Sequence, residues 1–253
     1  MTALYRFWGR RNPEGRVKPP ILAKAPAGSV DEAGVATVRL YDPIDSWGGY
    51  WGVSAQEFLA TLDQLGDATQ IRLHINSPGG EVHEAIAILN ALRQHQARVT
   101  AIVDGLAASA ASFIACGADE LVMSQNTELM IHDAWGIEIG PASAMREMGD
   151  RLDQVSNNVA SIYAKKSGKS TEECRAVMLA ETWYSAQEAV DAGLADSVDT
   201  GTGSAGDDAQ NRWDLSIYQH AGREKAPDPV LIPEPAAKFD VNNVIEALKG
   251  AFK

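Results

Sequence analysis

The sequence is poor in several features that mark particular classes of protein. Two cysteines, Cys116 and Cys174, occur among its 253 residues, too few for a disulfide scaffold and not spaced as metal ligands. No apolar run in it approaches the roughly 20 residues of a membrane-spanning helix. The opening segment, MTALYRFWGRRNPEG, has arginines but no apolar stretch behind them, so we do not expect a secretory signal peptide. These absences predict a cytosolic chain whose cysteines are reduced and buried.

Positive charge is also scarce. The sequence has 22 Lys and Arg residues against 34 Asp and Glu residues, a net charge of -12 at pH 7. Proteins that bind nucleic acid need a basic face to displace counterions from the phosphates, so this balance argues against a nucleic-acid partner. The sequence has 45% hydrophobic and 22% charged residues. This is the ordinary composition of a globular domain with a sizeable core.

Three zones of the chain differ in composition. Residues 1–32 carry scattered arginine, lysine and proline with little periodicity, which predicts an extended basic arm. Residues 33–200 hold nearly all of the regular apolar pattern and predict the folded domain. Residues 201–253 begin with GTGSAGDDAQN, a linker composition, and continue into a Pro-rich stretch and a short terminal helix. This last zone predicts a flexible C-terminal tail.

Strand and helix patterns alternate through residues 33–200. Runs of β-branched and apolar residues predict strands, and serines followed by glutamate three positions later predict capping boxes at the starts of helices. The alternation predicts an α/β fold with a largely parallel sheet and right-handed crossovers. The predicted strands are residues 35–41, 71–76, 98–103, 120–124 and 128–133; the predicted helices are residues 54–66, 80–94, 106–118 and 142–166, followed by two that begin at Ser170 and Ser185.

One serine lies where a strand passes into a helix. In VTAIVDGLAASAASFIACGA, small residues around Ser109 leave space beside its side chain. The backbone N–H groups at such a junction lack intrahelical partners and the helix dipole is positive there, so developing negative charge is stabilised. A helix cap or a small packing residue has the same local pattern. Ser112, about one turn later, is a rival nucleophile.

A glycine pair, Gly79-Gly80, follows the predicted strand at 71–76 in INSPGGEVHEAI. Glycines allow positive φ and leave bare N–H groups that can bind an oxyanion or a phosphate. The segment does not match the GxxxxGK[ST] pattern of a nucleotide-binding loop. A plain tight turn is the alternative interpretation.

A histidine and a carboxylate complete the candidate residues. His132 ends a short apolar strand in ELMIHDAWG and has the near-neutral pKa of a general base. Glu181, before the aromatic pair of AETWYSAQEAV, could orient an imidazole. Each is open to a structural explanation when taken alone. The other histidines are less well placed along the predicted elements: His74, His83, His95 and His220.

Together these segments contain a complete set of groups for acyl transfer. In their order and context they resemble the Clp protease proteolytic subunit family (ClpP) over about residues 34–200, through INSPGG, the turn GLAAS, MIH and SAQEAVDAGLADSV. The resemblance implies a ClpP/crotonase-like fold and a serine endopeptidase. It assigns Ser109 as nucleophile, His132 as general base, the N–H groups of Gly80 and Ala110 as oxyanion hole, and Glu181 in place of the family's aspartate.

The ends of the chain depart from that family. The N-terminal segment does not resemble the loops with which ClpP receives an unfoldase, and the Pro-rich tail is foreign to it. LYRFW, the glutamate at 181 and ETWYSA instead resemble the ClpP-related head maturation (prohead) proteases of tailed phages. This resemblance implies ATP-independent cleavage of scaffold and capsid proteins inside the assembling procapsid, in the host cytoplasm, by a homo-oligomer. No cofactor, metal ion, nucleic acid or membrane is implied.

Other functions stay open on the sequence. A crotonase-like acyl-CoA enzyme would use the glycine loop without a Ser-His pair, and a non-catalytic assembly protein would keep only the scaffold. A Ser-Lys dyad is disfavoured because no lysine occurs between Asp42 and Tyr163.

The helix at 142–166 carries an apolar stripe with alternating steps of four and three residues. Such a stripe forms either a coiled-coil seam with a second copy or a contact with its own domain. The stripe consists of Met148, Leu152, Val155, Val159 and Ile162.

Overall fold

The computed structural model describes residues 30–49, 51–201, 213 and 215–229. Most of the predicted basic arm and of the predicted tail, including the terminal helix, lies outside the described residues. The strands are β1 (Val35–Leu40), β2 (Gln70–Ser77), β3 (Arg98–Ala108), β4 (Glu120–Ser124), β5 (Glu128–Ile131), β6 (Thr182–Ser185) and β7 (Ser197–Asp199). Within the described residues they form a seven-stranded sheet in the order β1-β2-β3-β4-β7, with β5 paired to β3 and β6. All of these pairs are parallel except β5–β6, which confirms the largely parallel sheet.

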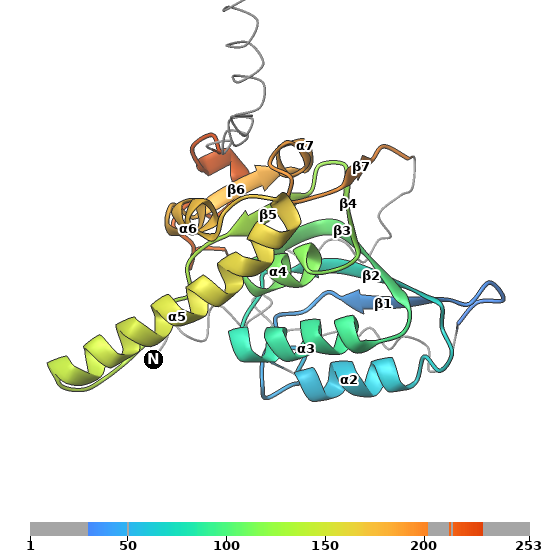
Figure 1. The fold of residues 1–253 in the computed structure, drawn as a ribbon, viewed down its shortest axis with the longest axis horizontal. Helices are drawn as coiled ribbons and strands as arrows, with labels where there is room; N and C mark the ends of the chain where they lie inside the picture. The colour runs from blue at the N-terminus through green and yellow to red at the C-terminus, as the bar shows by residue number, and fades with distance from the viewer. Residues whose placement is uncertain (1–29, 50, 202–212, 214, 230–253) are drawn as a thin grey trace, which may run out of the picture.

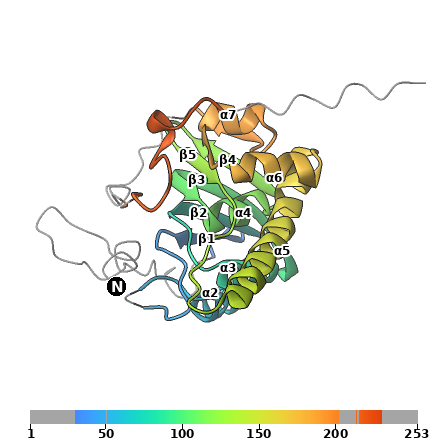
Figure 2. The same cartoon turned by 90° about the vertical axis from the view of Figure 1, so that its left-hand side faces the viewer.

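Most of the helices lie on one side of this sheet (Figure 2), and α5 (Ala142–Ser167) projects from the body of the domain (Figure 1). Each predicted capping box is present, with its serine accepting from the glutamate N–H and its glutamate accepting in return. None of the helices in the described part of the chain has the length and apolar composition needed to cross a membrane. The helices are α2 (Ala55–Asp63), α3 (Val82–Gln94), α4 (Ala110–Cys116), α5 (Ala142–Ser167), α6 (Thr171–Leu179), α7 (Ala186–Asp191) and the short 3-10 turn η2 (Arg223–Lys225).

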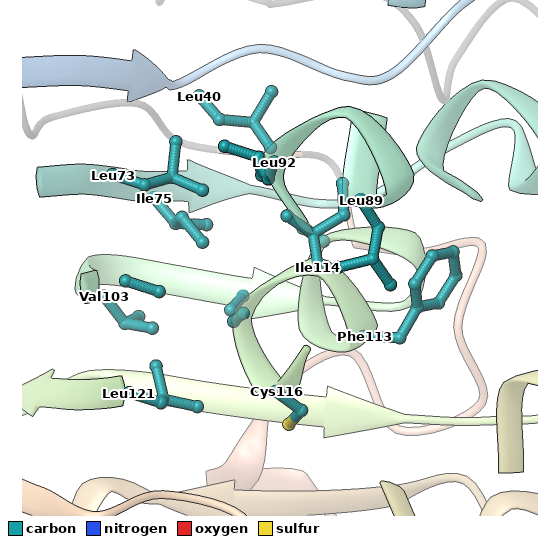
Figure 3. Packing of buried hydrophobic residues seen from close by; sticks show 14 of the residues in the cluster. Leu40, Leu73, Ile75, Leu89, Leu92, Val103, Phe113, Ile114, Cys116 and Leu121 are labelled. Carbon is teal, nitrogen blue, oxygen red and sulfur yellow. The ribbon is translucent and has the colours of Figure 1, made fainter. Parts of the chain in front are cut away.

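The main core lies between the sheet and the helices that cover it (Figure 3). Alternate residues of β2 are fully buried because successive side chains of a strand point to opposite faces. Burying each large aliphatic side chain contributes roughly 1.5–3 kcal/mol, so the strand ends that carry the site are held on a rigid base. Both cysteines are buried and unpaired, as predicted.

The structure corrects the predicted end of the strand at 98–103. β3 continues to Ala108, and the helix expected over 106–118 begins only at Ala110 and ends at Cys116. Asp104-Gly105 is not a turn, because residues 106–108 pair with residues 128–130 of β5. Sheet pairing outweighs the helix propensity of the alanines here.

Two short strands are missing from the predicted order. β6 pairs antiparallel with β5, and β7 pairs parallel with β4. They span four and three residues, too few for an alternating pattern to predict a strand from the sequence. β6 also ends at Ser185, the serine of a capping box, so the helix signal adjoins the strand without a break.

Part of the predicted flexible tail is described by the structure and packs against the domain. Residues 215–229, hereafter the strap, lie on the side of the sheet opposite α5 and α6 (Figure 2). Arg223 anchors the strap to α7, since its Nε and Nη2 each donate to the Glu188 carboxylate at 2.7 Å. The strap packs on the sheet through a second apolar cluster. The buried members of this cluster are Leu106, Ala108, Met130, Trp183 and Tyr218, and the partly buried ones are Trp213, Leu215, Ile217 and Ala226.

Candidate active site

Ser109 lies at the junction of β3 and α4 in a strained backbone conformation. Its φ of 53° and ψ of -123° are rare for any residue but glycine. The backbone is held there by its own N–H, which donates to the Met130 carbonyl of β5 at 2.9 Å. The Ser109 side chain makes no capping hydrogen bond to α4. Its hydroxyl is therefore available to a different partner.

That partner is His132. Its Nε2 lies 2.7 Å from the Ser109 Oγ, because the pairing of β5 with the end of β3 brings the residue after β5 beside the serine. Burial lowers the pKa of the imidazole from its ordinary 6.5 to about 4, an effect that the Glu181 charge partly opposes. The imidazole is therefore neutral at neutral pH and able to accept a proton from the serine.

Glu181 is buried at the turn between α6 and β6, with a φ of 49°. It lies close enough for its charge to act on His132, but the described residues include no hydrogen bond between the two side chains. Its carboxylate instead accepts from the indole Nε1 of Trp183 at 3.1 Å and from the backbone N–H groups of Gln219 and His220 at 2.7 and 2.8 Å. The structure thus brings Glu181 to the site and gives it partners that the sequence did not indicate.

The glycine loop lies against the Ser109 turn. Gly79 has a φ of 90°, and a Cβ on it would lie 2.5 Å from the Ala108 carbonyl oxygen. Gly80 has a φ of 150°, and a Cβ there would lie 2.0 Å from the Ile44 carbonyl oxygen. Only glycine permits these approaches. Among the described residues, neither the Gly80 N–H nor the Ala110 N–H has a hydrogen-bond acceptor, so both remain available to an oxyanion.

Ser112 is placed differently from Ser109. It is completely buried, and its Oγ bonds to the Ser109 carbonyl oxygen at 2.6 Å and to the Tyr163 hydroxyl at 2.7 Å. These partners make it a structural residue rather than a rival nucleophile. No lysine lines the space around Ser109 within the described part of the chain, which leaves no base for a Ser-Lys dyad.

A cleft of about 390 Å³ opens beside Ser109 and His132. Gly80 and the first residues of α3 line one side, and residues 134–137 with α5 line the other. The apolar stripe of α5 contributes Met148, Leu152 and Val155 to this lining, while its Val159 is buried in the domain core. The stripe therefore contacts its own domain along the cleft and the core. These contacts do not test whether α5 also mediates self-assembly, which stays a prediction.

One aromatic residue of the site was not predicted from the sequence. The Tyr218 ring packs edge-on against His132, with ring centroids 5.3 Å apart and planes at 80°. Its hydroxyl donates to the carbonyl of Pro78, just before the glycine pair. The available signal was the alternation of large apolar and polar residues in WDLSIY, between the linker and the Pro-rich stretch. No cluster of three or more metal-ligating side chains occurs among the described residues.

Comparison with known proteins agrees with this geometry. The family model for Clp protease matches residues 38–202, which include the serine, histidine and glutamate of the site and end before the strap. The ATP-dependent Clp protease proteolytic subunit of Pleurastrum terricola is 33% identical over 148 residues, covering 58% of this chain and 74% of that protein. The subunit of Chlorella vulgaris is 33% identical over 128 residues (50% and 64%), and that of Streptococcus pneumoniae 32% over 145 residues (55% and 74%). The chain therefore belongs to the Clp protease family and is a ClpP-like serine peptidase.

Proposed function

We propose that Ser109 and His132 are the nucleophile and general base of this serine endopeptidase. The observation that supports the proposal most directly is the 2.7 Å contact between Ser109 Oγ and His132 Nε2. The Ser109 side chain makes no capping hydrogen bond, and the lowered pKa of His132 keeps the imidazole neutral. This is the geometry that activates a hydroxyl for attack on a carbonyl.

In the proposed reaction, Ser109 Oγ bonds to the carbonyl carbon of a peptide while its proton passes to His132 Nε2. The oxygen of the tetrahedral intermediate becomes negative and accepts from the Gly80 and Ala110 N–H groups, each of which contributes on the order of 3 kcal/mol. The C–N bond then breaks, and His132 returns the proton to the leaving amine. A water molecule releases the acyl group by the same steps.

Glu181 has an electrostatic role in this proposal. Its negative charge stabilises the imidazolium that forms when His132 accepts the proton. Since its carboxylate already accepts three N–H donors, it is held at a fixed place rather than free to move with the ring. A glutamate can replace the aspartate of the family here because strap and indole donors fix its longer side chain.

For the biological role, we propose maturation of a phage head. The substrates would be scaffold and capsid proteins, cleaved without ATP inside the assembling procapsid in the host cytoplasm. Support comes from the LYRFW and ETWYSA segments and from an N-terminal segment unlike an unfoldase-receiving loop. The cleft beside Ser109 has a largely apolar α5 wall that suits an extended peptide. Self-assembly through the projecting α5 (Figure 1) fits the oligomeric habit of the family.

Purified protein incubated with candidate capsid and scaffold proteins, without nucleotide, tests this role. We expect defined fragments, identified by mass spectrometry, that are absent with Ser109→Ala. Cleavage only after an ATP-driven unfoldase is added would contradict the ATP-independent role, and cleavage by the Ser109→Ala protein would contradict the site.

A crotonase-like acyl-CoA enzyme fits the site less well. Such an enzyme has no use for a serine hydroxyl 2.7 Å from a histidine nitrogen. A non-catalytic assembly protein likewise has no need of two unpaired N–H groups beside that hydroxyl. Reaction of the protein with a fluorophosphonate separates both alternatives from the peptidase.

A further inference from the structure

The strap lies outside the matched family region but reaches the centre of the site. The match ends at residue 202, whereas the strap covers residues 215–229. We propose that the strap belongs to the active site. In this proposal Tyr218 is a positioning residue that holds His132 and the glycine loop in place. This inference rests on the proposed function of Ser109 and His132.

Tyr218 touches both halves of the proposed machinery. Its ring packs edge-on against the His132 imidazole, and the Trp183 ring supports it from β6 at a centroid distance of 5.9 Å. Its hydroxyl donates to the Pro78 carbonyl, and the Ser109 hydroxyl interacts with the same phenol. One side chain therefore fixes the base and the loop that presents the Gly80 N–H.

The next two residues of the strap hold Glu181. Both donate through the backbone, Gln219 to Oε2 and His220 to Oε1. Hydrogen bonds from N–H groups to a carboxylate fix its position and direction. Three consecutive residues of the strap thus contact the base, the loop and the carboxylate. A segment that only covered apolar surface would not require these polar contacts.

Tyr218 contacts His132 and the Ser109 hydroxyl without lining the substrate cleft. The cleft is lined by the glycine loop, α3, residues 134–137 and α5, and Tyr218 is not among its lining residues. Changing Tyr218 should therefore alter the chemical step more than the binding of a ligand in the cleft.

Because His132 is enclosed, its pKa can test the role of Tyr218. A purely structural role of Tyr218 would leave this pKa unchanged. Its ring faces Ser109 at the β3–α4 junction, Glu181 before β6 and Tyr218 of the strap. Tyr163 of α5 lines the small cavity shared with His132, and Glu81 and His83 line the cleft. Removing the Tyr218 ring admits water to the imidazole, which relieves the desolvation and raises the His132 pKa from about 4 toward 6.5.

The test measures inactivation of the full chain by a fluorophosphonate, as kinact and KI across pH. For Tyr218→Ala we expect kinact to fall roughly 10-fold to 100-fold, the cost of small misplacements of reacting groups, with KI nearly unchanged. We also expect the acid limb of kinact/KI to move to higher pH. Tyr218→Phe keeps the ring but removes the hydroxyl that contacts the Pro78 carbonyl and Ser109. Its acid limb should therefore stay in place while kinact falls by a few fold, about the effect of one or two lost hydrogen bonds.

Glu224→Ala is the matched control, because Glu224 is an exposed residue of the strap outside these contacts; it should leave both constants unchanged. Circular dichroism melting shows whether each variant folds. If Tyr218→Ala does not fold, a Tyr218→Phe protein with unchanged kinact overturns the proposal. An unchanged acid limb and kinact in folded Tyr218→Ala, or a higher kinact that marks the strap as inhibitory, also overturns it. Inactivation of Ser109→Ala at the normal rate would instead refute the proposed function itself.

Discussion

The two sides of His132 are built in different ways. On one side, Ser109 and the glycine loop come from strand ends within the matched family region, and each has a local sequence signature. On the other side, Tyr218 and the donors to Glu181 come from a strap beyond that region. The comparison indicates that the nucleophile, the base and the oxyanion donors are positioned by local geometry within the matched region. The surroundings of the base and the carboxylate depend instead on a long-range contact from outside that region.

The largest expected effect lies on the first side. Ser109→Ala should lower kcat by roughly 10⁴-fold to 10⁶-fold, because the catalytic groups act as a unit. The protein should stay folded, since the Ser109 hydroxyl caps no helix. The measurement is cleavage of an unfolded protein substrate beside a melting curve.

Ser112→Ala is the matched control. It removes a buried hydroxyl with two partners, so it should cost about 1 kcal/mol or more of stability and leave most of the activity. The reverse pattern, with Ser112 essential and Ser109 dispensable, would exchange the roles assigned to the two serines.

The glycine loop should give the next largest effect. A Cβ at Gly80 meets the Ile44 carbonyl oxygen, so Gly80→Ala must displace the loop and its N–H. Losing one oxyanion donor costs about 10²-fold to 10³-fold in kcat. Gly66→Ala is the control, because Gly66 also has positive φ (57°) but nothing within 4 Å of a Cβ. Equal losses of activity in both variants would mean that backbone strain, not the oxyanion site, is responsible.

Glu181→Gln tests the second side. It removes the charge beside His132 and weakens the bonds from the strap. We expect kcat to fall roughly 10-fold to 100-fold, less than the roughly 10⁴-fold loss when a directly hydrogen-bonded triad carboxylate is replaced. Steady-state kinetics check this, with exposed Glu172→Gln of α6 as control. A loss as large as that of Ser109→Ala would show that Glu181 bonds to the imidazole during the reaction.

Changing the pH near neutrality should have the smallest effect on activity. Since His132 must be neutral to accept the serine proton and its pKa is about 4, activity should be lost only as pH falls through about 4. The rate at pH 5 should then be close to that at pH 7. An acid limb near pH 6.5 in the unchanged protein would mean that His132 is open to water.

The same contrast explains what the sequence could predict. Ser109, His132, Gly80 and Ala110 lie in segments whose glycines, strand ends and small residues are readable locally, and the structure brings all of them together. The capping boxes were predicted for the same reason. The predicted end of β3 was wrong, because the pairing of β3 with β5 is a non-local contact that overrides the local helix preference of the alanines. The place of the strap could not be predicted, because its contacts join a tail segment to Pro78, Glu181 and Glu188 far along the chain.

The most direct test of the central claim is to map where a fluorophosphonate attaches. Digestion and mass spectrometry of the labelled full chain should place the adduct on Ser109. The adduct should be nearly absent when His132→Ala protein is treated in the same way, because the 2.7 Å contact that activates the hydroxyl is lost. An adduct on Ser112 or another residue, or labelling of Ser109 at an undiminished rate without His132, would contradict the account.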